Sequence, residues 1–263
     1  MRILITWRIC FLILFTMILV QSALAYGPSA YDDDLDDAEA EAEAKRDMAA
    51  FMQYTAPFRF GDDLQPGDFV SYGVVGEEGE RSSIVEIEVL AADAPNQVWV
   101  HERFDGNDVR VLYDTTTHKL ISLYGFDENG LRQDPPLNSD SEVEERVNEM
   151  KNMMQMIGIG LIVPSQWEQQ QEPVTIRGSF GSISCSTQVP VFSAMITSKL
   201  SADELEELTE GLQLHFSDDI PKLIPTQAMF MLLSQEQLLG ASSIGLAQGL
   251  GFEMINYTKT ARN

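Results

Sequence analysis

Cysteine is nearly missing from this chain, whose 263 residues include only Cys10 and Cys185. Cys10 lies in an N-terminal segment that we predict to be removed, which would leave one thiol. A single cysteine cannot form an intramolecular disulfide, nor can it build a zinc site made mainly of cysteines. Stability must therefore come from apolar packing, and about 210 ordered residues are enough for one large domain.

Basic residues are also scarce, with 17 Lys and Arg against 41 Asp and Glu and a net charge of −24. Such a charge repels nucleic-acid phosphates and anionic lipid head groups, and it argues against both as partners. The three histidines are His101, His118 and His215, and none stands in H-x-H, H-x-x-x-H or H-E-x-x-H spacing. The sequence therefore predicts no metal site and no cofactor.

Motifs of catalysis are missing as well. Cys185 alternates with Ile183, as expected of a small buried hydrophobe in a strand, and no serine stands in a Gly-x-Ser-x-Gly elbow. The glycines of residues 245–251 lack the Lys-Ser/Thr of a phosphate-binding loop and favour a bend or bulge before the last strand. Carboxylates are plentiful, but nothing in sequence fixes the separation of any pair. We assign no catalytic residue and expect a protein that is not an enzyme.

Residues 1–25 have the pattern of a secretory signal peptide. Arg2 and Arg8 supply the positive charge, residues 9–20 the apolar core, and residues 23–25 the small-x-small cleavage site. Tyr26 stands where a lipoprotein would have its lipidated cysteine. Removal of the segment would take the net charge from −24 to −26, because it carries two arginines and no acids. We expect an exported protein, periplasmic or secreted, without a stable membrane anchor after cleavage.

Residues 26–47 form an acidic leader in which like charges repel one another, so we expect it to be disordered or partly helical. Its aspartates lack the glycine and distal glutamate of an EF-hand calcium loop. Strong helix formers fill residues 38–54, and a helix there would dock Met48, Phe51 and Met52 on the following domain. We predict that this domain spans residues 48–263.

The stretch of residues 67–126 predicts a meander of antiparallel strands separated by turn-forming clusters. Val85, Ile87 and Val89 alternate with Glu86 and Glu88, which indicates one buried face and one wet face. The five predicted strands are residues 68–75, 82–91, 97–104, 109–114 and 119–126. Further strands are predicted at residues 174–180, 182–187, 191–197, 212–216, 228–233 and 250–257.

Helical periodicity is clearest over residues 139–163, where Ser139 with Glu142, or Ser141 with Glu144, forms a capping box. A second capping box, Ser201 with Glu204, predicts a short helix from Ser201 onward.

Methionine is concentrated on the longer predicted helix, and flexible thioethers suit a surface that accommodates varied apolar partners. Ordinary core packing would give the same spacing. Our candidate ligand-binding residues are Met150, Met154 and Ile157 on this helix, together with Trp99 from the meander.

Three short stretches carry a resemblance: Leu-Gln-Pro-Gly-Asp-Phe-Val-Ser-Tyr at residues 64–72, Gly-Ser-Phe with Ile-Ser-Cys at residues 178–185, and Phe-Ser-Asp-Asp-Ile-Pro at residues 216–221. With the order of the elements, they resemble the half-barrel lipoprotein carriers of the bacterial periplasm and related exported families. The resemblance implies a concave apolar face that holds acyl chains. Because the lipidation cysteine of some members is missing here, no lipoprotein-sorting role is carried over.

The predicted fold is therefore α+β: a strongly curved, half-barrel-like antiparallel sheet of about eight to eleven strands with the helix of residues 139–163 against its concave face. The first functional hypothesis is binding of an apolar or lipidic ligand, or of an envelope partner, without catalysis. A hydrolase whose site is assembled only in three dimensions is one alternative. An interaction module whose acidic leader contacts a basic partner is the other.

Overall fold

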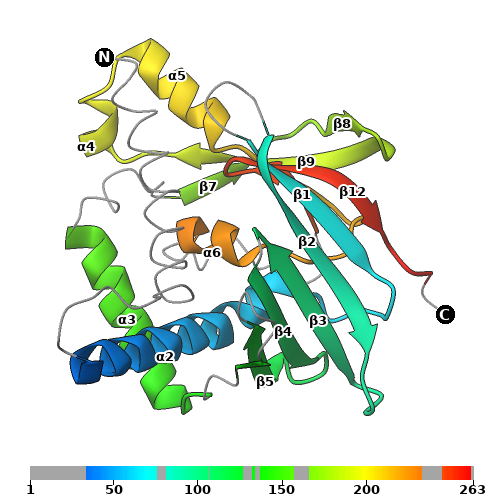
Figure 1. The fold of residues 1–263 in the computed structure, drawn as a ribbon. Coiled ribbons are helices and arrows are strands. Elements are labelled where there is room, and N and C mark those ends of the chain that lie inside the picture. Colours follow the sequence, from blue (N-terminus) through cyan, green and yellow to red (C-terminus); the bar gives the residue numbers. More distant parts are fainter. Residues whose placement is uncertain are drawn as a thin grey trace.

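A computed structural model describes residues 34–75, 81–105, 107–126, 132–133, 137–156, 166–232 and 245–261 (Figure 1). The predicted signal peptide and the first part of the acidic leader lie outside these residues. The helices are α2 (Asp34–Arg59), α3 (Asp140–Met156), α4 (Ala194–Thr197), α5 (Ala202–Gly211) and α6 (Thr226–Leu232). The strands are β1 (Phe69–Val75), β2 (Arg81–Ala91), β3 (Gln97–Phe104), β4 (Asn107–Asp114), β5 (Lys119–Phe126), β6 (Arg132–Gln133), β7 (Gln166–Gln169), β8 (Val174–Gly178), β9 (Gly181–Val191), β10 (Leu214–Ser217), β11 (Gly245–Gly249) and β12 (Phe252–Thr258).

The strands form one large antiparallel sheet in the order β6-β5-β4-β3-β2-β1-β12-β11-β10-β9-β7, and β8 pairs with β9 as well. The α+β class and the meander are confirmed, since β1 to β5 follow one another in both sequence and space. The last described strand, β12, pairs with β1, so the first and last of the described strands are neighbours in the sheet. Within the described residues the sheet is not closed, and β6 and β7 are its two ends.

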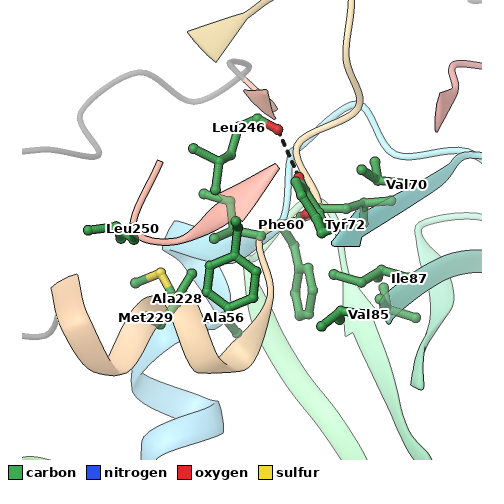
Figure 2. Close-up of a cluster of buried hydrophobic side chains, with 14 of the residues drawn as sticks. Ala56, Phe60, Val70, Tyr72, Val85, Ile87, Ala228, Met229, Leu246 and Leu250 are labelled. Carbon is green, nitrogen blue, oxygen red and sulfur yellow. Dashed lines mark hydrogen bonds between the residues drawn. The ribbon is translucent and has the colours of Figure 1, made fainter. Parts of the chain in front are cut away.

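One face of the sheet, which we call the inner face, carries the core. Val85, Ile87 and Val89 of β2 are fully buried there, while Glu86 and Glu88 point to the opposite, outer face and stay partly exposed. The predicted alternation is therefore confirmed. Residues of α2 and α6 pack on the same cluster as the inner-face strands (Figure 2).

Helix α2 runs without interruption across the predicted boundary between the acidic leader and the domain. Phe51 and Met52 are buried and Met48 packs at the edge of the core, as the sequence predicts. The helix contacts β5 and α6, and α3 packs along it. Arg146 of α3 donates to Asp47 of α2 over 2.6 Å. No described helix has the length and apolar character needed to cross a membrane.

Both predicted capping boxes are formed. The Ser201 hydroxyl accepts from Glu204 N, and the Glu204 carboxylate accepts from Ser201 N, at the start of α5. The Ser139 hydroxyl and the Glu142 carboxylate exchange the same two hydrogen bonds before α3. These local signals identified the helix starts because each satisfies backbone donors that a helix leaves unpaired.

Two of the predicted strands are wrong. Residues 228–233 were expected to be extended, but they fall largely in helix α6, which starts directly after Pro225. A short apolar run does not distinguish a buried strand from a buried helix, and a proline favours the helix start. The strand expected at residues 191–197 is replaced by the end of β9 and helix α4, whose first turn bonds back to the carbonyl of Ser193.

The glycines of residues 245–251 make a strand and a tight hairpin rather than only a bend. β11 and β12 pair through Gly249 and Phe252, which leaves Leu250 and Gly251 as a two-residue loop. Both loop residues have positive φ, 56° and 76°. Such φ values match the twist of a two-residue hairpin, and glycine tolerates them without strain.

Asp68, the residue before β1, connects this strand to the segment that follows β12. Its carboxylate is fully buried and accepts from Gln65 N over 2.9 Å and from Thr260 N over 2.7 Å. Gly67, with φ of +93°, lets the chain turn sharply between them. The Leu-Gln-Pro-Gly-Asp stretch is therefore a structural turn that holds β1 and the segment after β12 together.

We expect Asp68→Ala to lower the free energy of unfolding by about 1–3 kcal/mol, because it leaves two partly buried backbone donors without their acceptor. Urea denaturation measures this change. Asp93→Ala, at an exposed aspartate, is the control and should change stability little. Equal effects of the two substitutions would show that the turn is not held by the Asp68 carboxylate.

Candidate functional site

Most described core residues on the inner face of the sheet are apolar. Side chains from β1, β2, β3, β4 and β12 contribute to it. Figure 2 shows side chains of α2 and α6 beside those of β1 and β2. The fully or almost fully buried strand residues are Val70, Tyr72, Val74, Val85, Ile87, Val89, Val98, Val100, Val111, Tyr113, Phe252 and Met254.

A group of four hydrogen-bonded residues lies within this apolar layer where α2, β3 and α6 meet. We call them the Arg59 junction: Arg59, Glu102, Thr226 and Met52. The guanidinium of Arg59 is fully buried and pairs through Nη2 with Oε2 of Glu102. Its Nε donates to the carbonyl of Ile224 over 2.9 Å, and its Nη1 donates to Sδ of Met52 over 3.3 Å. Thr226 donates to both Glu102 oxygens, from N over 2.8 Å and from its hydroxyl over 2.7 Å.

Removal of Arg59 from water is the largest electrostatic effect on its pKa at this junction. Burial lowers the pKa of Arg59, and the nearby carboxylate of Glu102 opposes that shift. The guanidinium also lies over the ring of Phe60, 4.6 Å from its centroid. A buried ion pair of this kind recovers its desolvation cost only when both charges keep their partners. The junction therefore fixes how the helices sit on the sheet.

Tyr72 makes a second polar connection. Its hydroxyl lies 3.0 Å from the carbonyl of Leu223 and 2.9 Å from that of Leu246, the latter drawn in Figure 2. Burial raises the pKa of this hydroxyl, so it stays a neutral donor. Tyr72 thus ties β1 to the segment that leads into α6 and to β11.

Sequence reasoning missed both charges of the junction. The signal for Glu102 was present, because strand alternation puts it on the inner face with Val100 and Phe104, where a carboxylate needs a partner. Arg59 gave a weaker signal, as a basic residue in the last turn of α2. Nothing in the sequence pairs the two, since they lie 43 positions apart.

The predicted ligand-binding residues are not all brought together. Met150 of α3 is half-buried and packs at the edge of the core. Trp99 alternates with the buried Val98 and Val100 and so lies on the outer face, where its ring centroid is 5.5 Å from that of Tyr124. The side chain of Met154 and the whole of Ile157 lie outside the described residues.

The histidines lie apart, each with its own partner. His101 contacts Asp108 on the outer face, His118 lies 3.2 Å from the Tyr113 hydroxyl, and His215 lies 2.8 Å from that of Thr187. Burial lowers the pKa of His101, against the effect of Asp108, and also that of His215. In the part of the chain that the structure describes, no three His, Cys, Asp or Glu side chains gather as metal ligands would.

Cys185 is buried in β9, as its alternation with Ile183 predicts. Burial raises the pKa of its thiol, which keeps it protonated and unreactive. The buried position of Cys185 supports a role in core packing rather than in catalysis.

For the junction we expect Arg59→Met alone to cost about 3–5 kcal/mol of stability, because Glu102 is left as an unpaired buried charge. The double variant Arg59→Met/Glu102→Leu should recover most of this loss, since an apolar pair needs no counter-ion. Urea denaturation of the wild type, both single variants and the double variant gives the coupling energy.

Arg103 and Glu86, an exposed pair 3.2 Å apart on the outer face, provide the matched control. The cycle Arg103→Met/Glu86→Leu should show a coupling of about 0–1 kcal/mol. Additive effects in the Arg59 cycle would refute a coupled buried pair.

Stability should also depend on pH through His215. Its pKa in the folded protein lies below the ordinary value of about 6.5, so the unfolded chain binds the proton more tightly. The contribution is therefore complete above about pH 6.5 and is lost as the pH falls below that value. Urea midpoints measured across this range should fall less steeply for His215→Gln. Thr187→Val should keep the wild-type slope of midpoint against pH, because burial and not the Thr187 hydroxyl lowers the pKa of His215. An unchanged slope in His215→Gln would contradict the assignment of this pH dependence to His215.

Comparison of the chain with protein-family models, with curated proteins and with solved structures gave no match in any of the three.

Proposed function

We propose that this protein is exported and binds an apolar or lipidic ligand without catalysis, using the inner face of its sheet. One observation carries the proposal: an open sheet presents a continuous apolar face, and the helices that cover it are attached through a few polar contacts. In this proposal the sheet curves around the ligand, and residues 139–163, of which α3 is the described part, extend the helix layer on the concave side.

The way the helix layer is fastened supports this proposal. Among the described residues, Arg59 of α2 and Thr226 of α6 both donate hydrogen bonds to Glu102 of β3, while Tyr72 contacts the segment before α6. The described core residues of α2 and α6 include Phe51, Ala56 and Met229, which are apolar, and an acyl chain can replace apolar contacts without leaving polar groups unpaired. A ligand would therefore exchange its own apolar surface for that of the helices.

The open edges of the sheet support it further. In the described chain β6 and β7 do not pair with each other, so the sheet is open between these two strands. The layer above contains α6 (Thr226–Leu232), which begins three residues after Leu223, whose carbonyl Tyr72 contacts. Its position depends on Thr226 and the apolar contacts of Met229. Such a segment is suited to be displaced when a ligand enters.

The proposal predicts a bound apolar molecule. Native mass spectrometry of gently purified protein should reveal a co-purifying adduct, and protein stripped of it should bind an apolar fluorescent dye saturably. Tyr72→Phe should accelerate dye association by about fivefold, which corresponds to the net loss of one hydrogen bond that restrains the α6 segment.

Tyr124→Phe, on the outer face beside Trp99, is the matched control and should leave association unchanged. Protein that carries no adduct and shows no saturable dye binding would refute the proposed function. An envelope protein recovered in place of a small molecule would identify a partner as the occupant.

A further inference from the structure

We infer that the ligand carries an oxyanion at one end of its apolar chain, and that Arg59 binds this group. The inference rests on the proposed function, because it concerns the ligand of the same inner face. A carboxylate and a phosphate monoester share the required chemistry. Both present oxygens that accept two parallel hydrogen bonds from a guanidinium.

The hydrogen bonds of Arg59 are incomplete for a buried guanidinium. The group has five N–H bonds. One goes to the Ile224 carbonyl, one to Glu102, and one to the Met52 thioether at 3.3 Å, which is a weak acceptor. Among the described residues, the second N–H of each terminal nitrogen has no acceptor. A fully buried cation thus keeps donor capacity that an oxyanion would fill.

Glu102, by contrast, has other donors. Thr226 donates to both of its oxygens, over 2.8 Å and 2.7 Å. Arg59 belongs to α2, whereas Glu102 belongs to β3, so separating α2 from the sheet breaks the ion pair and leaves Glu102 hydrogen-bonded to the start of α6. Glu102 then loses its counter-ion as well, but it keeps two hydrogen bonds, whereas Arg59 loses the strongest of its three.

This asymmetry selects the ligand. A neutral apolar chain that lifts α2 from the sheet leaves the Arg59 charge without a counter-ion in an apolar surrounding, which is costly. A chain that ends in an oxyanion supplies the counter-ion as it enters. The negative end of such a ligand would therefore lie at Arg59, and its chain along the apolar inner face.

Three probes with the same chain test the inference: dodecanoate, dodecyl phosphate and dodecanol. Their affinities for the full-length protein are measured at neutral pH by displacement of the apolar dye. We expect at least one of the two anions to bind about tenfold more tightly than dodecanol, the size of effect that a charge-assisted hydrogen bond gives. The two anionic arms distinguish a carboxylate ligand from a phosphate ligand.

Two variants test the role of Arg59. In Arg59→Met/Glu102→Leu, which removes both charges and so avoids an unpaired one, the ratio of anion to alcohol affinity should fall to near one. In Glu102→Gln, which removes the competing carboxylate, the ratio should rise above the wild-type value. Arg103→Met/Glu86→Leu, on the outer face, should leave the ratio as it is.

Equal binding of dodecanol and both anions by the wild type would overturn the inference and leave the proposed function intact. A preference for anions that persists in Arg59→Met/Glu102→Leu would also overturn it. If none of the three probes displaces the dye, or the dye itself does not bind, the proposed function fails as well. The two failures are therefore distinguishable.

Discussion

A guanidinium and a carboxylate taken out of water, Arg59 and Glu102, constrain the rest of this structure. Removing two charges from water costs several kcal/mol per ion, and good geometry is needed to recover that cost. The end of α2, the middle of β3 and the start of α6 must therefore meet at hydrogen-bonding distance. A slip of β3 by one residue would turn Glu102 to the outer face and leave Arg59 unpaired.

The order of the sheet brings these distant segments together. β12 pairs with β1, so the two halves of the chain share one inner face. Asp68, just before β1, secures the same connection through its bond to Thr260, just after β12. Helix α2 precedes the described strands in sequence and yet lies over the inner face, with Ala56 and Phe60 in the core beside the residues of α6 (Figure 2). Stability and the candidate ligand surface therefore depend on the same contacts.

Local patterns predicted the parts of the fold that local physics controls. The strict alternation around Ile87 gave the buried face of β2, and the capping boxes at Ser139 and Ser201 gave the starts of two helices. The pattern failed over residues 228–232, because a short apolar run has no period that distinguishes helix from strand. Trp99 was placed among the ligand-binding residues, although strand alternation already put it opposite to Val98 and Val100.

The sequence by itself determined the α+β class, the strands of the meander and the dependence on apolar packing, because these follow from residue periods, turn residues and the count of cysteines. Only the tertiary structure decided that Arg59 faces Glu102, that Tyr72 reaches Leu246, and that α2 contacts both α3 and α6. These contacts join residues that are 43 and 174 positions apart. No local pattern encodes such partners, because each forms only when the whole sheet has brought its segments together.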